Sequence, residues 1–187
     1  MGKSKADERS YWTLEEFQKF SDAIMDKRDS WMAFQILFWT GMRIGELLAL
    51  QVKDVNFDDG TIRVDESLTR LDGEDLITAP KTESSVRVIT IHKELQDEIR
   101  EHISTLYRPK PGTRLFVGRT KSFFEHEMER GIKSSGVKKI TVHCTRHSHA
   151  RLILSNQLSV GYIPICMQIL DLSRINWKMG GKNSLYV

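Results

Sequence analysis

Cysteine is scarce in this sequence, and a long hydrophobic run is missing. The two cysteines, Cys144 and Cys166, could form at most one disulfide bond, so reduced thiols inside a cell are the better expectation. No apolar stretch approaches the length that crosses a bilayer, and the opening MGKSKADERS has no apolar core of the kind found in signal peptides. The sequence thus argues against the secreted and membrane-spanning classes, and we expect a cytoplasmic protein.

An excess of charge of one sign is also missing. The 28 Lys and Arg residues face 25 Asp and Glu residues, which gives a formal net charge of +3. A charge this small permits an acidic partner such as nucleic acid but does not demand one, because binding depends on the clustering of cations on one face. With 187 residues, of which 40% are apolar, the chain has the size and composition of one globular domain, with or without an appendage.

Apolar residues at helical spacing predict a mainly α-helical domain. The first helix begins after Thr13, whose side chain can cap it, and Glu16 can return the hydrogen bond. The second helix, SWMAFQILFWT, ends at Gly41, and a short helix, IGELLAL, follows. Further helices are expected in KELQDEIREHI, SFFEHEMERGIKSSG and TVHCTRHSHARLILSN. The apolar residues of the last helix are expected to be buried: Ala150, Leu152, Ile153 and Leu154.

Two stretches between these helices alternate in polarity and predict β-hairpins. VNFDDGTIRV has Asp59-Gly60, a strong hairpin signal, between its alternating halves. LITAPKTESSVRVITI is predicted as strand, polar turn and strand, with Pro80 at a strand end or edge. The expected fold class is therefore α+β, mainly α-helical with a small antiparallel sheet. The expected divisions are a disordered lead at 1–10, a domain at 11–157 and an atypical C-terminal tail at 158–187.

Cationic side chains occur at three places where an element begins or turns. Arg43 lies at the start of the short helix, Lys81 in the polar turn of the second predicted hairpin, and His143 and Arg146 at the start of the last helix, one turn apart. Taken singly, each would be an ordinary surface charge. However, the rigid fork of an arginine can donate two parallel bonds to a phosphate, a lysine supplies a positive charge and a proton, and helix N-termini add amide donors. Gathered at one point, these groups would form a site for a single tetrahedral anion.

The segment HCTRHSH also suggests a metal site, because His143 and His147 are spaced by one helical turn, with Cys144 and His149 close by. No matching ligand pair occurs elsewhere in the sequence, so no metal is expected. His147 is therefore assigned to a buried, hydrogen-bonded role or to a supporting role. The aromatic residues, including Trp12, Trp31 and Trp39, follow helical periodicity and are expected in the core rather than on a base-stacking surface.

Three motifs occur in an order and at spacings that resemble a known family. TGMRIGELLAL matches the pattern Thr-Gly-x-Arg-x-(Gly/Ser)-Glu-x-x-x-Leu and contains Arg43 and Glu46. PKTESSVR contains Lys81, and HCTRHSHA matches the pattern His-x-x-Arg-His at residues 143–147. These motifs resemble the catalytic domain of the tyrosine recombinase family, the phage and transposon integrases, over about residues 11–157.

The resemblance implies site-specific DNA recombination or integration by strand cleavage and rejoining, through a 3′-phosphotyrosyl intermediate. It implies that Arg43 and Arg146 stabilise charge on the phosphoryl oxygens. Lys81 would protonate the 5′-oxygen leaving group, His143 would assist proton transfer or orient the phosphate, and Glu46 would hold Arg43 in position.

The resemblance also implies the setting of this chemistry. The partner would be double-stranded DNA, with self-association of the protein on DNA and a bacterial, nucleoid-associated location. No cofactor or metal is implied, because the energy of the broken phosphodiester is kept in the covalent intermediate. The resemblance implies no membrane and no small-molecule substrate either. The chain would correspond to a catalytic domain without the DNA-clamping N-terminal domains of the family.

The C-terminal tail lacks two features that the family pattern places after the second box, a Leu-Gly-His box and then the tyrosine nucleophile. Tyr162 and Tyr186 follow no Gly-His pair, and Trp177 is a candidate for the third box on spacing alone. The nucleophile is therefore unassigned, and the chain by itself is expected to form no covalent adduct with DNA. The alternative is a truncated, non-catalytic module that binds DNA or a partner integrase, and a general phosphodiesterase is a weaker third alternative.

Overall fold

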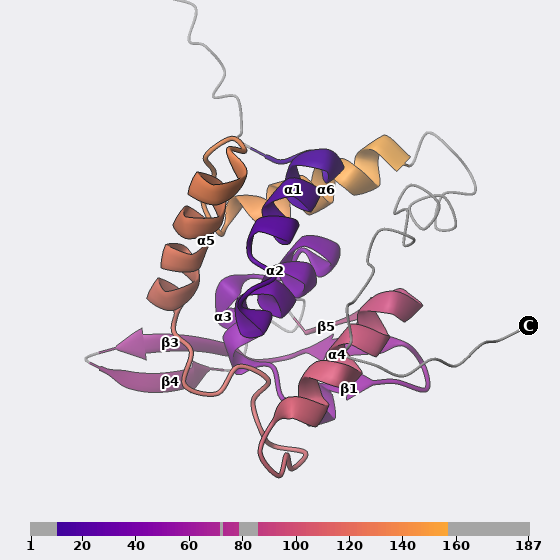
Figure 1. Cartoon of the computed structure of the whole chain (residues 1–187). Coiled ribbons are helices and arrows are strands. Elements are labelled where there is room, and N and C mark those ends of the chain that lie inside the picture. The colour runs from indigo at the N-terminus through magenta and orange to yellow at the C-terminus, as the bar shows by residue number, and fades with distance from the viewer. Residues whose placement is uncertain (1–10, 72, 79–85, 157–187) are drawn as a thin grey trace, which may run out of the picture. The chain divides into compact units, whose positions relative to one another are not determined.

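The structure is a computed structural model that describes residues 11–71, 73–78 and 86–156 (Figure 1). The helices are α1 (Leu14–Ala23), α2 (Arg28–Thr40), α3 (Ile44–Ala49), α4 (Lys93–Thr105), α5 (Lys121–Ser135) and α6 (Cys144–Asn156), with a 3-10 turn, η1, at Val52–Asp54. The strands are β1 (Val55–Asn56), β2 (Thr61–Val64), β3 (Ser67–Leu71), β4 (Glu74–Thr78) and β5 (Arg87–Thr90). The predicted α+β class, mainly helical with small antiparallel pairing, is confirmed. No helix within the described ranges combines the length and apolar composition that a membrane span needs.

The predicted helix boundaries are confirmed at their caps. The Thr13 hydroxyl accepts a hydrogen bond from the Glu16 amide at 3.2 Å, and the Glu16 carboxylate accepts one from the Thr13 amide at 2.9 Å. Gly41 ends α2 with φ +62°, and Gly136 ends α5 with φ +70°. Glycine adopts this left-handed conformation without the steric cost that a Cβ brings. The cap at Gly41 stops α2 just before Arg43.

Two small antiparallel sheets take the place of the single predicted sheet. One has the strand order β1-β2-β5, and the other consists of β3 and β4. The β1–β2 hairpin around Asp59-Gly60 is confirmed, with Val55 opposite Ile62. The second predicted hairpin is wrong, because β4 pairs with β3 and β5 pairs with β2. The two strands that flank Lys81 in sequence therefore belong to different sheets.

A two-residue connection explains the partner of β4. Leu71 lies opposite Glu74, so only Asp72 and Gly73 join β3 to β4. Gly73 has φ +87°, and an Asp-Gly pair is typical of tight hairpins. A short connection brings two strands together at a small entropic cost, whereas the longer stretch 79–86 separates β4 from β5.

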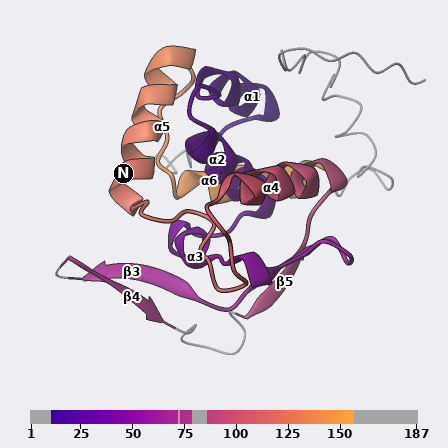
Figure 2. The ribbon, with the colours of Figure 1, turned by 60° about the horizontal axis from the view of Figure 1, so that its bottom comes forward.

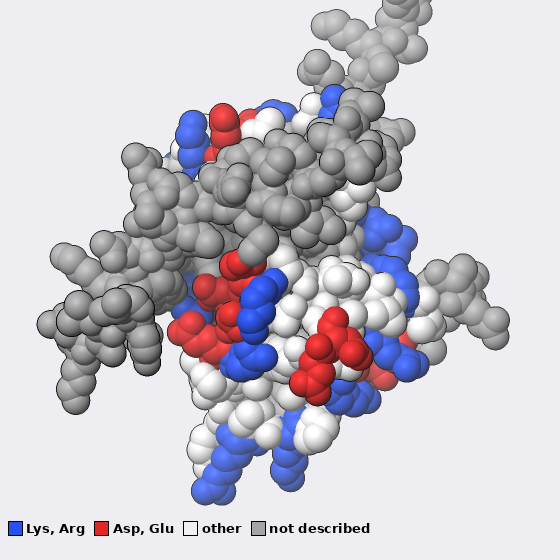
Figure 3. Space-filling model, turned by 90° about the vertical axis from the view of Figure 1, so that its right-hand side faces the viewer, with Lys and Arg blue, Asp and Glu red and all other residues white. Residues whose placement is uncertain are grey.

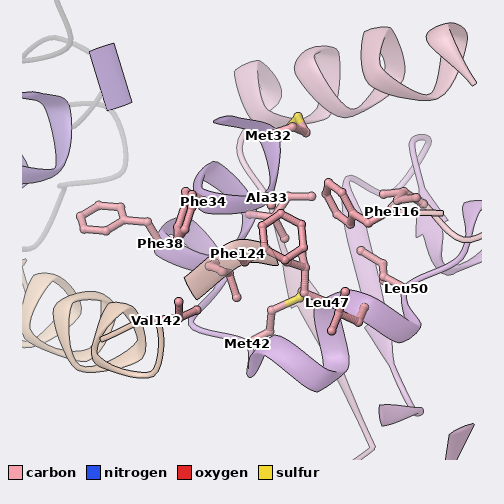
Figure 4. Packing of buried hydrophobic residues seen from close by; sticks show 14 of the residues in the cluster. Met32, Ala33, Phe34, Phe38, Met42, Leu47, Leu50, Phe116, Phe124 and Val142 are labelled. Atoms are coloured by element: carbon pink, nitrogen blue, oxygen red, sulfur yellow. The ribbon is translucent and has the colours of Figure 1, made fainter. Parts of the chain in front are cut away.

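The hydrophobic core is built around α2. Met32, Ala33 and Phe34 of this helix have no exposed surface. Figure 4 shows α2 side chains beside those of α3, α5 and the segment before α5. The Phe17 and Phe38 rings stack with their centroids 3.7 Å apart, which joins α1 to α2. The predicted place of the aromatic residues in the core is confirmed, with Trp12 and Trp31 buried and Trp39 partly buried.

The short helix α3 connects the helical layer to the β3–β4 hairpin. Figure 2 shows α1, α2 and α4 on one side of this part of the molecule and the hairpin along the other. α3 packs against β3. A Cβ on Gly45 would lie 2.6 Å from the Ser67 hydroxyl oxygen and 2.9 Å from the Leu68 carbonyl oxygen, so this close approach requires glycine. Arg43, at the start of α3, is thus carried on an element packed from both sides.

The burial predicted for α6 is confirmed in part for Leu152, which is partly buried and packs against the core, and is wrong for Ala150 and Ile153. The burial of Leu154 lies outside what the structure describes. Ala150 is exposed and Ile153 is 45% exposed, whereas Thr145 and Ser148 are 0% and 1% exposed. The Thr145 hydroxyl donates to a backbone carbonyl at 2.7 Å, and the Ser148 hydroxyl accepts from the Trp12 amide at 2.9 Å. A hydroxyl whose hydrogen bonds are made can be buried at little cost. The inward face of α6 is therefore mixed: the buried Thr145 and Ser148 lie there together with the partly buried Leu152.

Candidate active site

Arg43 lies at the N-cap of α3, with an extended backbone of φ −80° and ψ 153°. Its amide donates to Oε2 of Glu46 at 2.7 Å, the backbone half of a capping box. Its side chain is 55% exposed. The backbone of Arg43 is therefore fixed while its guanidinium remains accessible to a ligand from solvent.

Glu46 binds two arginines from different elements. Its side chain is only 8% exposed. Arg43 donates through Nη1 to Oε1 at 3.1 Å, and Arg87 of β5 donates through Nη1 to Oε1 at 3.1 Å and through Nη2 to Oε2 at 2.6 Å. Burial raises the pKa of Glu46. The hydrogen bonds from Arg87, from the Arg43 amide and from the Arg43 side chain, together with the positive charge of Arg87, outweigh burial and lower the pKa below its ordinary value. The carboxylate stays ionised and holds both forks.

Arg146 connects α6 to the same turn. Its Nη1 donates to the Gly41 carbonyl oxygen at 2.7 Å, a contact between residues 105 positions apart in sequence. Burial lowers the pKa of Arg146, and the positive charges of Arg43 and Arg87 lower it further, while Glu46 raises it. The guanidinium groups of Arg43 and Arg87 thus bind the Glu46 carboxylate, and the Arg146 guanidinium lies within electrostatic range of all three.

The two predicted site histidines lie at the start of α6. His143 is exposed in the turn before the helix, and His147 is half-buried in its first turns. Their ring centroids are 5.4 Å apart and the rings are nearly perpendicular, at 86°. Among the described residues, no three His, Cys, Asp or Glu side chains are grouped so that they could hold a metal ion.

The structure brings Arg43, Glu46 and Arg146 together, which is part of the predicted convergence of Arg43, Lys81, His143 and Arg146. Lys81 lies outside the described residues. Sequence reasoning missed Arg87 as a partner of Glu46, although a signal was present. Along β5 the exposed residues alternate with partly buried ones, and Arg87 shares its face with Ile89. A charged residue on the inward face of a strand indicates a buried partner of opposite charge.

A second missed residue is His149. Its Nδ1 lies 3.0 Å from the Phe38 carbonyl oxygen, and its ring lies against Gly41. The sequence stretch HCTRHSH offered several histidines, and only a tertiary contact distinguishes this one. The histidine of α6 that bonds the end of α2 is therefore His149, whereas His147 contacts the His143 ring.

The local charge suits an anionic ligand. Three guanidinium groups against one carboxylate leave an excess of positive charge, although the whole chain carries only +3. One other face of the molecule has mixed charge: Figure 3 shows Lys and Arg side chains beside Asp and Glu side chains among its described residues. A face of mixed charge gives little attraction for a phosphate backbone, so the concentration of arginines near Gly41 stands out. Guanidinium forks at this point can donate several hydrogen bonds to one tetrahedral oxyanion.

A tyrosine hydroxyl was not assigned from sequence, and two of the four tyrosines are described. The Tyr11 ring lies against Lys138 and Arg151, with the Lys138 Nζ 5.1 Å from the ring centroid. Tyr107 is 86% exposed in the segment after α4. Tyr162 and Tyr186, like Trp177, lie outside the described residues.

Comparisons of the sequence with known proteins give one consistent result. The phage integrase family matches residues 12–173. The chain is 33% identical to the ICEBs1 integrase of Bacillus subtilis (strain 168) over 159 residues, which cover 77% of this chain and 43% of the relative. It is 30% identical to the integrase of Mycobacterium phage L5 over 125 residues, which cover 62% of this chain and 33% of the relative. The chain thus spans less than half the length of these curated relatives.

Solved structures share the fold. The Tn1549 transposon integrase, in complex with a circular intermediate DNA, superposes with a TM-score of 0.71 at 25% sequence identity, over 81% of this chain and 55% of that chain. The XerA recombinase superposes with a TM-score of 0.60 at 22% identity, over 78% of this chain and 51% of that chain.

Proposed function

The chain belongs to the phage integrase family, and from this premise we propose that it acts in site-specific DNA recombination by strand cleavage and rejoining through a 3′-phosphotyrosyl intermediate. One observation carries the proposal. Arg43 and Arg146, far apart in sequence, lie at one turn, where Arg146 donates to the Gly41 carbonyl at 2.7 Å and Glu46 holds Arg43. This is the arrangement of donors that a scissile phosphodiester needs.

The proposed partner is double-stranded DNA. Support comes from the positive excess at the turn and from the Tn1549 transposon integrase, whose structure contains a circular intermediate DNA. We also propose that copies of the protein associate with one another on DNA and that the working unit is the domain at 11–157.

In the proposed reaction, a tyrosine oxygen attacks the phosphorus and the bond from phosphorus to the 5′-oxygen breaks. Arg43 and Arg146 donate hydrogen bonds to the phosphoryl oxygens as their negative charge grows. Lys81 gives a proton to the departing 5′-oxygen, and His143 orients the phosphate or assists the proton transfer. A second DNA strand then attacks through its 5′-hydroxyl and releases the tyrosine, so no external energy source is consumed.

Supporting residues act behind these groups. Glu46 and Arg87 fix the direction of Arg43. Arg87 donates two hydrogen bonds to the Glu46 carboxylate and holds it in place, and that carboxylate accepts a hydrogen bond from the Arg43 guanidinium. His147 supports His143 through the contact of their rings. The nucleophile stays unassigned, and Tyr162 and Tyr186 lie outside the described ranges.

The proposal can be tested without knowing the nucleophile or the target site. A pool of nicked duplexes with randomised sequence is incubated with the chain, with and without hydrogen peroxide as a small nucleophile. A peroxide oxygen can attack the phosphorus in place of the tyrosine oxygen, and the 5′-oxygen leaves with a proton. We expect sequence-selective strand scission with peroxide, and, as predicted from the sequence, no covalent protein–DNA adduct from the chain alone.

Matched variants identify the phosphate site. Arg43→Ala and Arg146→Ala are expected to abolish the peroxide-supported scission, whereas Arg70→Ala, on the β3–β4 hairpin, is expected to leave it intact. Scission that persists in both site variants would refute the assigned roles. Retained DNA binding without any scission would support the non-catalytic DNA-binding alternative, which the comparisons do not favour.

A further inference from the structure

His149 and Gly41 fit together where the two sequence boxes meet. Gly41 has φ +62°, and a Cβ at this position would lie 2.5 Å from Cδ2 of His149. The position is thus closed to other residues by its backbone conformation and also by the imidazole ring. A ring in such close contact limits how the Gly41 peptide can move.

The hydrogen bond of His149 fixes the end of α2. The Phe38 carbonyl belongs to the last turn of α2, where the helix supplies no intrahelical partner. A carbonyl only accepts, so Nδ1 of His149 carries the hydrogen and donates it across 3.0 Å. Burial lowers the pKa of His149, and Arg146 lowers it further against the opposite effect of this hydrogen bond, so the imidazole stays neutral.

Two side chains of α6 therefore donate hydrogen bonds to the C-terminal end of α2. Arg146 donates to the Gly41 carbonyl and His149 donates to the Phe38 carbonyl. Phe38 lies in the last turn of α2, and Gly41 is the residue that caps this helix. The guanidinium of Arg146 uses one nitrogen on Gly41, which leaves its other donors for a ligand. The direction of those donors depends on where the Gly41 carbonyl points.

We propose that His149 is a positioning residue for the phosphate site: by its bond to Phe38 and its contact with Gly41 it fixes the carbonyl that orients the Arg146 guanidinium. This inference rests on the proposed function, because it concerns the contact of Arg146 with a DNA phosphate. His149 itself touches neither the DNA nor the reacting atoms.

Three variants at position 149 distinguish the effect of the hydrogen bond from the effect of side-chain volume. The amide nitrogen of Asn lies about where Nδ1 of His lies, so His149→Asn keeps the donor. Leu has the same branching as Asn but no donor, so His149→Leu loses it. Should His149→Leu fail to fold by circular dichroism, His149→Gln serves instead, since its amide lies one bond farther out and misses the Phe38 carbonyl.

The measurement is the salt dependence of binding to a duplex of random sequence. Arg146→Ala is expected to reduce the slope of log K against log salt by about 0.9, the value for one lost phosphate contact. His149→Leu is expected to produce most of this reduction, and His149→Asn is expected to restore the wild-type slope. The double variant Arg146→Ala/His149→Leu should behave like Arg146→Ala alone, because His149 acts through Arg146.

The double variant Arg146→Ala/His149→Leu distinguishes a positioning role of His149 from a merely structural role. A merely structural role would weaken binding equally with or without the Arg146 side chain, and such additive effects would overturn the inference while leaving the proposed function intact. A wild-type slope in His149→Leu would overturn it as well. An unchanged slope in Arg146→Ala would overturn the proposed phosphate site, and the inference with it.

Discussion

The substitution Glu46→Gln tests the centre of the candidate site. The carboxylate is 8% exposed and accepts hydrogen bonds from the Arg43 amide and from the guanidinium groups of Arg43 and Arg87. Glutamine has the same shape, but it carries no charge and replaces one acceptor oxygen by an amino group. That group would face donors, so at least one guanidinium bond is lost and another is weakened.

The expected loss of stability follows from these contacts. A hydrogen bond to a charged group contributes about 1.5–3 kcal/mol. The Arg43 side chain is 55% exposed and that of Arg87 is 28% exposed, so water replaces part of what is lost. We therefore expect Glu46→Gln to reduce the free energy of unfolding by about 2 kcal/mol. For a domain of this size the Tm should fall by about 4–8 °C.

Glu16→Gln is a matched control. Glu16 occupies the same capping position in α1 and accepts a single hydrogen bond, from the Thr13 amide. Both variants lose a negative charge in the first turn of a helix, so their effects through the helix dipole are alike. Glu16→Gln should cost about 0.5 kcal/mol. The difference between the variants, measured by thermal unfolding, isolates the contribution of the two guanidinium groups, and equal Tm shifts would contradict the reasoning.

The pH dependence of this difference has a defined sign. The pKa of Glu46 in the folded state is lowered below its ordinary value of 4.5. The ionised carboxylate therefore contributes its stability fully above pH 4.5, and the contribution is lost as the pH falls through the lower folded-state pKa. Wild type and Glu46→Gln should differ most at neutral pH and converge in acid. A difference that grows as the pH falls below 4.5 would refute the assignment.

Three further substitutions test the fold and the chemistry. Gly131→Ala should reduce stability by about 1–3 kcal/mol in urea unfolding, because its Cβ would lie 2.4 Å from a Phe20 ring carbon; an unchanged midpoint would show that α1 and α5 separate easily. Glu127→Gln should cost about 2 kcal/mol by the same assay, since the buried carboxylate accepts from Lys27, Ser30 and Arg130, and no loss would mean that these bonds contribute nothing net. Lys81→Ala should slow peroxide-supported scission but recover on a substrate with sulfur in place of the 5′-oxygen, because a thiolate leaves without a proton; equal defects on both substrates would contradict a role as general acid.

Local signals predicted much of the fold and, within the candidate site, the placement of Arg43 and Glu46. The capping box at Thr13 and the terminal glycine at Gly41 mark helix ends through backbone chemistry that acts over one turn. The placement of Arg43 and Glu46 follows from the same short-range logic, because both lie on the first turn of α3. That Arg146 lies near Arg43 was predicted by resemblance, since no local rule connects residues so far apart; the contact of Arg146 with the Gly41 carbonyl was not predicted.

The errors have two physical causes. The pairing of β4 was missed because Asp72-Gly73, a local hairpin signal, was overlooked in favour of the longer stretch around Lys81. The inward face of α6 could not be read from apolar spacing, because Thr145 and Ser148 are buried through hydrogen bonds whose partners are set by tertiary structure. Contacts of this second kind determine the position of His149 as well.

The near balance of charge in the whole chain makes the few arginines of the site more important. With a net charge of +3, long-range attraction to DNA is weak. In the proposed binding to DNA, the affinity would then depend on a small number of phosphate contacts, each of which contributes separately to the salt dependence of binding. Because one carboxylate, Glu46, holds two of the guanidinium groups and a backbone carbonyl holds the third, these groups are oriented in the absence of a ligand. Loss of an orienting group should therefore weaken phosphate binding nearly as much as loss of an arginine itself.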